Sequence, residues 1–209
     1  MPENTPTGWQ GELAYLGWNE IVAQQHAKRA VEIALCGGHT AFLVGNKHSQ
    51  CEDLAAWARI FDGKVYAAYP CPCGWLGDGR HECTCGLDAL IAYRQEHYPA
   101  YGIDIWIEMP RVGDHEIEAH LQRGGEPWAN VEGRIIRTHK LRVHPDYQSL
   151  VLDEAGMSIM RAAERQLGWG GGQAVRVVNV ARTIATAACE KAIRVPHLAE
   201  AIQYCVRTT

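Results

Sequence analysis

The sequence predicts an α/β fold that ends in a bundle of helices. Two observations lead to this prediction: short apolar runs alternate with helical patterns up to residue 110, and residues 149–209 show helical spacing alone. The chain has 209 residues, which is enough for a sizeable core, and its 47% hydrophobic and 21% charged residues are typical of globular proteins.

The first half of the chain is expected to alternate helices and strands. Helices are predicted where apolar residues recur every three or four positions, and strands where short apolar or alternating runs occur. Gly37 and Gly38 are expected to end the first helix. The predicted elements are a helix from an N-cap at Asn19 to about Leu35, a strand at Thr40–Gly45, a helix at 49–60, a strand at 64–69, a helix at Leu87–His97 and a strand at Ile103–Pro110.

Helices are expected in the rest of the chain. Residues 113–148 are polar and weakly periodic, and we interpret them as a connector with a helix from about Trp128 to Lys140. Residues 149–209 are expected to form helices that bury one face each. The residues predicted to face inward are Met160, Ala163 and Leu167, then Ala174, Val177, Val178, Ala181, Ile184, Ala185 and Ala188, and finally Leu198, Ala201, Ile202 and Cys205 in a helix that begins near Pro196.

The expected organisation is a flexible segment 1–18, an α/β core 19–112 with a cysteine-rich loop 69–86, the connector 113–148 and the helical region 149–209. The chain begins without the pattern of a secretory signal and contains no apolar run long enough to span a bilayer. We therefore expect a cytoplasmic protein with no membrane partner. The net charge of −4 argues against a large basic surface for nucleic acid.

Four of the eight cysteines form two Cys-x-Cys pairs, Cys71 with Cys73 and Cys83 with Cys85. A reducing cytosol favours metal ligation over disulfides, and zinc takes four thiolate or imidazole ligands. These cysteines are therefore predicted to bind a structural Zn²⁺ ion, with His81 as an alternative ligand. Reduced thiols held by packing, disulfides and catalysis are the other interpretations. The remaining cysteines, Cys36, Cys51, Cys189 and Cys205, are interpreted as small core residues.

Four separated segments resemble magnesium-chelatase-like AAA+ ATPases, the branch that includes the competence-type helicases. "QHAKRAVEIALCGGHTAFLVG" is similar to the segment that leads into their phosphate-binding loop. "YPCPCGWLGDGRHECTCG" and "IDIWIEMPRV" are similar to their cysteine segment and the strand after it. Residues 164–207 resemble their C-terminal helical lid. The resemblance implies a three-layer α/β core with a helical lid, here in truncated form.

The same resemblance implies that the ATPase motifs are degenerate. A phosphate-binding loop reads Gly-x4-Gly-Lys-[Ser/Thr], so that backbone amides and a lysine contact phosphates while a hydroxyl holds Mg²⁺. Here the segment reads "GNKHSQCE", in which Gly45 is kept, Cys51 takes the lysine position and Glu52 takes the hydroxyl position. Lys47 and His48 remain as candidates for contact with an anion, or belong to a solvated loop.

Other positions of the family pattern are also changed. No apolar strand ending in Asp-Glu lies between Glu52 and the cysteines, and the similar "SLVLDEAG" is interpreted as the acidic first turn of a helix, with Asp153 and Glu154. Tyr69 takes the place of the family's polar sensing residue, and Gly102 and Gly172 take the places of two family arginines. Arg176 and Arg182 remain in the lid.

These changes predict a non-catalytic homologue that acts as a zinc-stabilised protein-interaction module. A related AAA+ ATPase or a second copy of the chain is the expected partner, with Trp75 and Trp169 as candidate anchors. One alternative is residual binding or hydrolysis of Mg²⁺-ATP through Gly45, Lys47 and Arg176. Another is nucleic-acid binding through the cysteine loop and the basic segment 134–144.

Overall fold

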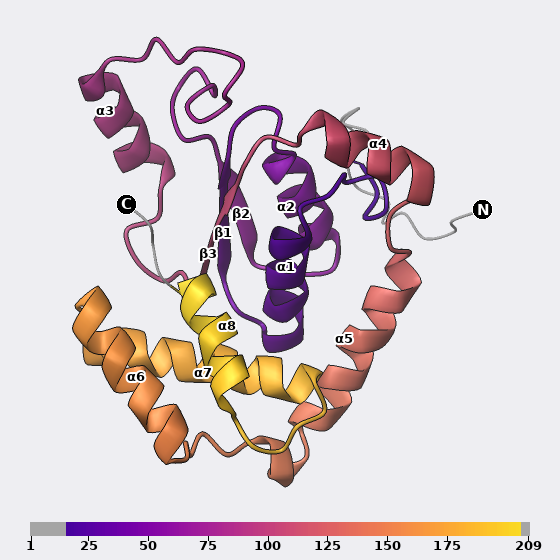
Figure 1. Cartoon of the computed structure of the whole chain (residues 1–209), viewed down its shortest axis with the longest axis vertical. Coiled ribbons are helices and arrows are strands. Elements are labelled where there is room, and N and C mark those ends of the chain that lie inside the picture. Colours follow the sequence, from indigo (N-terminus) through magenta and orange to yellow (C-terminus); the bar gives the residue numbers. More distant parts are fainter. Residues whose placement is uncertain (1–15, 206–209) are drawn as a thin grey trace.

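The computed structural model describes residues 16–205 of an α/β protein (Figure 1). Most of the segment that was expected to be flexible, residues 1–15, lies outside the described residues. Among residues 16–205, no helix is both long and apolar enough to cross a membrane.

The centre of the fold is a small parallel sheet. Its strands are β1 (Ala41–Gly45), β2 (Val65–Ala68) and β3 (Ile105–Met109), in the order β2-β1-β3. Both neighbours pair with β1 in parallel, and Ala41 lies opposite Val65 on one side and Ile105 on the other. The predicted strands are therefore confirmed. Because all of them run in the same direction, the loops that follow them meet at one edge of the sheet, the carboxyl edge.

Two helices, α1 (Gln25–Gly37) and α2 (Cys51–Ile60), pack against one face of this sheet. The predicted end of α1 is confirmed, since Gly38 adopts a left-handed φ of 69° after the last turn. Its predicted N-cap is wrong. Asn19 lies in a separate turn, closed by a hydrogen bond from the Ile21 N–H to the Gly17 carbonyl, and the chain reaches α1 only after a left-handed Gln24.

The other face of the sheet is covered by aromatic side chains. Phe42 of β1 contacts Trp106 of β3 with ring centroids 4.8 Å apart, and Tyr98 packs edge-on against Phe42 at 5.3 Å. Tyr98 follows helix α3 (Leu87–His97), which itself buries no residue. The expected three-layer arrangement is thus found only in part, because the cover on this face comes from the segment after α3 and not from a packed helix.

Two helices lie in the segment interpreted as a connector, α4 (Asp114–Arg123) and α5 (Trp128–Arg142). The second was predicted and the first was not. Most residues of α4 are polar, and its two large apolar residues, Ile117 and Leu121, are exposed, so the helix buries no residue and its sequence signal is weak. Its start nevertheless carries a capping signal, since the Glu116 carboxylate accepts a hydrogen bond from the Gly113 N–H at 2.8 Å.

The C-terminal helices are α6 (Glu154–Leu167), α7 (Gly171–Ala187) and α8 (Val195–Cys205), preceded by a single 3₁₀ turn, η1 (Pro145–Tyr147). They lie at the end of the molecule opposite the cysteine-rich loop (Figure 1). Helix α7 is the most buried of them and contacts α1, α5 and α8. Most of the residues predicted to face inward do so, but the prediction is wrong for Leu167 and Ala188. Leu167 is 44% exposed because it lies in the last turn of α6, and Ala188 is exposed because α7 ends at the residue before it.

Two polar residues fix the ends of these helices. Asp153 is the N-cap of α6 and accepts a hydrogen bond from the Gly156 N–H at 2.7 Å, which confirms that the "SLVLDEAG" segment begins a helix. Arg182 is buried and donates to the carbonyls of Glu190 and Lys191, which lie just beyond α7. It therefore has a structural role in holding the segment that follows its own helix.

Candidate metal centre

The four cysteines of the two pairs lie together beyond the end of β2. The Sγ atoms of Cys71 and Cys73 are 3.4 Å apart, those of Cys73 and Cys83 are 3.6 Å apart, and those of Cys83 and Cys71 are 3.7 Å apart. With Cys85 included, all four sulfurs lie within 4.8 Å of one another. Thiolates that surround zinc tetrahedrally at about 2.3 Å are separated by about 3.8 Å. The cluster therefore has nearly the size of a four-thiolate metal site.

The environment of the thiols favours a negative charge on the cluster. The backbone N–H of Trp75 and hydrogen bonds from the neighbouring thiols bring the pKa of Cys73 down to about 6. The backbone N–H of Cys85 favours the thiolate of Cys83, but burial and the adjacent sulfurs outweigh it and raise the pKa of Cys83 to about 12. One thiolate thus holds protons on its neighbours, and a metal ion is able to replace those protons.

The other cysteines separate into two groups. Cys36, Cys51 and Cys205 are buried, as predicted. The interpretation of Cys189 as a core residue is wrong, because it is exposed and has a left-handed φ of 63° just after α7 ends. Its position in a turn explains the difference, since the inward face of α7 does not continue to residue 189.

The cysteine loop packs onto the loop between β1 and α2. The Lys47 N–H donates to the Gly74 carbonyl at 3.1 Å, and the Asn46 side-chain amide donates to the Gly77 carbonyl at 3.4 Å. The Lys47 ammonium lies 4.9 Å from the centre of the Trp75 ring. The cysteine loop therefore covers the carboxyl end of β1, which is where a nucleotide would meet a phosphate-binding loop.

The amides of the β1–α2 loop are used within the protein. The His48 and Ser49 N–H groups donate to the side chain and the carbonyl of Asn46, both at 2.9 Å, and the Cys51 N–H donates to Ser49 Oγ at 3.3 Å. The Ser49 side chain also fills the space beside Gly45, where an added Cβ would lie 2.1 Å from Ser49 Oγ. These amides do not form a cradle for phosphate.

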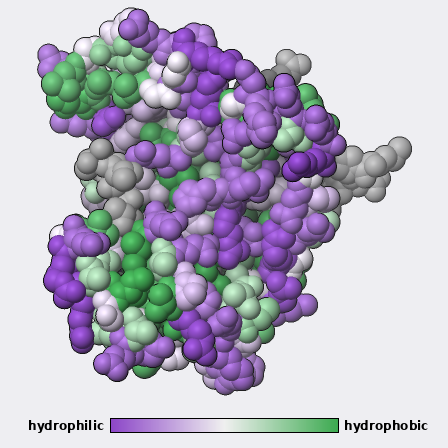
Figure 2. All heavy atoms as spheres, viewed as in Figure 1, coloured by the Kyte–Doolittle hydropathy of each residue, from purple (hydrophilic) through white to green (hydrophobic). Residues whose placement is uncertain are grey.

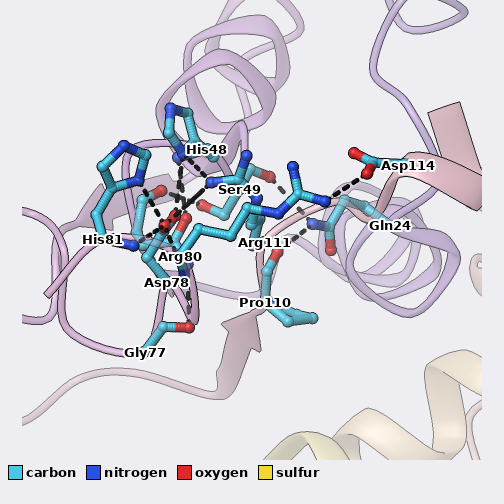
Figure 3. A network of polar contacts seen from close by, with 11 residues as sticks. Gln24, His48, Ser49, Gly77, Asp78, Arg80, His81, Pro110, Arg111 and Asp114 are labelled. Carbon is cyan, nitrogen blue, oxygen red and sulfur yellow. Dashed lines mark hydrogen bonds and ion pairs between the residues drawn. The ribbon is translucent and has the colours of Figure 1, made fainter.

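A second polar cluster, which we call the His–Asp–Arg cluster, consists of His48, Asp78, His81 and Arg111 (Figure 3). The buried Asp78 carboxylate lies 3.0 Å from His48 Nδ1, 2.8 Å from His81 Nδ1 and 3.0 Å from Arg111 Nη1. Burial disfavours the charge on Asp78, but the hydrogen bonds that the carboxylate accepts within the cluster outweigh it and hold the pKa of this carboxyl well below its usual range. Asp78 is therefore ionised and ties three segments together.

Sequence reasoning named two of these residues, His48 and His81, and missed the cluster as a site. Its members follow different strands: His48 comes after β1, Asp78 and His81 after β2, and Arg111 after β3. That position was the available signal, because loops after parallel strands meet at one edge. His81, considered as an alternative ligand of the cysteine cluster, contacts Asp78 and stacks on Trp75 with ring centroids 4.3 Å apart.

The residues considered for nucleotide binding lie in different places. Gly45 lines a cavity of about 660 Å³ over the aromatic face of the sheet, whereas Arg176 lines another of about 460 Å³ beside α7. Lys47 lies over Trp75, as described above. Arg176 Nε lies 3.8 Å from Asp104 Oδ1, and Arg176 Nη1 donates a hydrogen bond to Gln173 Oε1 at 2.9 Å.

Two cations of the basic segment 134–144, Arg134 and Arg142, form hydrogen bonds with other parts of the chain. Arg134 forms paired hydrogen bonds with Glu32 and with Glu126, and Arg142 donates to the Cys36 carbonyl at 2.6 Å. Arg137 and Lys140 remain exposed. The segment therefore presents fewer cations to a nucleic acid than its sequence suggests.

Comparison with known proteins identifies the C-terminal part of the chain. Residues 118–205 match the family model described as magnesium chelatase, subunit ChlI C-terminal. The match runs from within α4 to the end of α8, so it includes both the segment interpreted as a connector and the helical region. No curated protein matches the chain.

Proposed function

We propose that the chain, in which residues 118–205 match the magnesium chelatase C-terminal family, is a shortened AAA+ relative that acts as a zinc-stabilised protein-interaction module and does not hydrolyse ATP. The observation that carries this proposal is the position of the cysteine loop, which packs on the β1–α2 loop through Lys47 and Asn46. Zinc would therefore stabilise a surface at the place where an ATPase binds nucleotide.

Two features support the absence of ATP hydrolysis. Phosphoryl transfer depends on positioned cations and on Mg²⁺ beside the transferred phosphate. At the position of the Mg²⁺-binding hydroxyl, Glu52 accepts a hydrogen bond from the Tyr69 hydroxyl at 2.6 Å. At the position of the lysine, Cys51 is buried, and burial raises the pKa of its thiol, so this residue supplies no positive charge.

Zinc is proposed as the metal because of the ligand set. Four thiolates in one compact cluster match structural zinc sites, and such a site closes the coordination shell of the ion. The sulfurs come from two short segments joined by the loop 74–82, so the metal would join residues 71–73 to residues 83–85. Metal binding of this kind contributes directly to folding, because the ligands converge only in the folded chain.

Helix α3 is the proposed contact surface. It follows the last cysteine directly and buries none of its residues. Leu87 and Ile91 are one helical turn apart and are 71% and 47% exposed. Figure 2 shows apolar side chains gathered over this helix, next to polar surface. An exposed apolar stripe of this kind is typical of an interaction site, and we propose an intact ATPase of the same family as its partner.

The proposal is tested by three measurements on one tag-free preparation. Elemental analysis is expected to give about one zinc per chain, since four thiolates bind one ion. Calorimetry with Mg²⁺-ATP is expected to give no binding heat. The ATPase rate of an intact magnesium-chelatase-type enzyme is expected to change when the chain is added.

Matched variants make the third measurement specific. Leu87→Ser with Ile91→Ser should abolish the change in rate, because it removes the apolar stripe of α3. Leu121→Ser is the control, since Leu121 is 79% exposed on a different helix, α4. Tight binding of ATP would refute the absence of an ATPase site, and an unchanged rate with the unmodified chain would refute the proposed partner.

A further inference from the structure

The His–Asp–Arg cluster has the composition of a metal site that is separate from the four cysteines. His48, Asp78 and His81 each offer one ligand atom, and these atoms lie within 4.8 Å of one another. Two imidazoles and one carboxylate are a common ligand set for divalent transition metals, which then keep open positions for water or a substrate. The cluster also lies at the carboxyl edge of a parallel sheet, the usual place for ligand sites in α/β proteins.

The spacing of the ligand atoms fits a bound ion. Asp78 Oδ1 is 3.0 Å from His48 Nδ1, and Asp78 Oδ2 is 2.8 Å from His81 Nδ1. Neighbouring ligands at about 2.1 Å from a metal, arranged at right angles, are about 3 Å apart. The three side chains therefore need little movement to coordinate one ion.

A cation already lies against two of the three ligand groups, Asp78 and His48. Arg111 Nη1 is 3.0 Å from each oxygen of Asp78 and 2.5 Å from His48 Nδ1. A guanidinium has donors only, so His48 Nδ1 must accept, with its lone pair directed at Arg111. The carboxylate and this imidazole thus direct lone pairs at the same positive group, which is the arrangement that a metal ion requires.

The rest of the cluster gives access and rigidity. The His48 and His81 side chains are 38% and 50% exposed, whereas that of Asp78 is fully buried. The Asp78 carboxylate is fixed by the His81 N–H at 3.0 Å. Trp75 packs against both imidazole rings, with centroids 5.0 Å and 4.3 Å away. The ligands are therefore held in place and are reachable from solvent.

We propose that His48, Asp78 and His81 form a second, exchangeable site for a divalent transition-metal ion, in which Arg111 is the resident cation that the metal displaces. The site is distinct from the four cysteines, since its ligands are nitrogen and oxygen atoms. Arg111 leaves as the ion binds, and its side chain is already 22% exposed, so it has room to turn toward solvent. Metal binding at this site does not depend on the proposed function.

The experiment titrates Co²⁺ into the full chain, purified without an affinity tag and with its cysteine cluster saturated with Zn²⁺. Calorimetry measures the affinity, and the visible spectrum distinguishes the ligands, because cobalt bound by thiolates has charge-transfer bands that cobalt bound by nitrogen and oxygen lacks. One equivalent of Co²⁺ without thiolate bands is expected. The double variant His48→Ala with His81→Ala should lose it, and His115→Ala, an exposed histidine on α4, should keep it.

The variant Arg111→Met gives the most specific result. Removing the competing cation should strengthen Co²⁺ binding by at least about tenfold, because the ion no longer has to break the hydrogen bonds of Arg111 with Asp78 and His48. Arg80→Met is the control, since Arg80 pairs with Asp114 and lies outside the three ligands. Retention of the equivalent in the double histidine variant, or an affinity in Arg111→Met equal to or below that of the unmodified chain, would overturn the proposal.

Discussion

The ion pair between α1 and α5 gives the sharpest stability prediction. Glu32 of α1 is almost completely buried, with 4% of its side chain exposed, and Arg134 of α5 contacts both of its oxygens at 2.8 Å and 3.0 Å. Arg134 also forms an ion pair with Glu126 through the other edge of its guanidinium. Arg134→Met keeps the aliphatic stem that packs between the helices and removes the charge. The expected result is a loss of stability, because Glu32 stays buried with a poorer partner.

The magnitude follows from the burial of the two groups. Removing one partner of a buried pair costs about 3–5 kcal/mol. Arg134 is 33% exposed, and Arg29 remains 3.5 Å from Glu32, so both facts reduce the loss. We expect Arg134→Met to lower the free energy of unfolding by about 2–3 kcal/mol, which corresponds to about 4–12 °C in Tm for a chain of this size. Glu126→Gln, at a 40% exposed position, should cost less than about 1 kcal/mol.

A double-mutant cycle in urea separates this pair from general effects of substitution. Glu32→Gln removes the buried charge, so Arg134→Met should cost at least about 1 kcal/mol less in that background. Equal costs of Arg134→Met in the two backgrounds would refute the reasoning, because they would show that the pair carries no coupling. Arg134 would then be available as a phosphate contact.

Three further predictions concern the cysteine cluster, a buried histidine and the β1–α2 loop. If the four cysteines bind zinc as proposed, Cys85→Ser should lose the ion and lower the Tm, whereas Cys189→Ser should leave the zinc content and the Tm unchanged, as measured by elemental analysis and thermal melts. Burial lowers the pKa of His39, so as the pH falls through about 6.5 the unfolded chain takes up this proton before the folded chain does, and stability falls. His39→Gln should reduce that loss between about pH 7.5 and about pH 5.5 in urea titrations. Gly45→Ala should cost about 1–3 kcal/mol in the same titrations, since the new Cβ meets Ser49 Oγ and the Met109 carbonyl, and Ser49→Gly should restore part of it.

The strands and most helices were predictable because their signals are local. The apolar run at residues 41–45 is buried at every position in β1, and the spacing in α7 gives its inward face. The start of α1 was not predictable in this way. Gln24 occupies a left-handed conformation, and its side chain donates to the carbonyls of Ser49 and Pro110, so distant parts of the chain determine where the helix begins (Figure 3).

The cysteine cluster and the His–Asp–Arg cluster also differ in whether a local sequence signal predicts them. The four cysteines are close together along the chain, so their number and spacing are enough to predict that they cluster. His48, Asp78 and Arg111 follow three different strands, and only the parallel order β2-β1-β3 brings them to one edge. A pattern read along the chain shows the first kind of site, whereas the second kind requires the topology of the sheet.

The order of the strands also has a consequence for how the chain folds. Strands β1 and β2 are joined by one short helix, so their pairing closes a modest loop, whereas β3 must return across the whole cysteine loop and α3 to reach β1. Closing a longer loop costs more entropy and slows folding. A metal ion bound by the four cysteines would shorten that loop before β3 pairs. Refolding of the chain with and without zinc should therefore differ in rate as well as in final stability, and a nascent chain that lacks metal would expose the open side of β1 for longer.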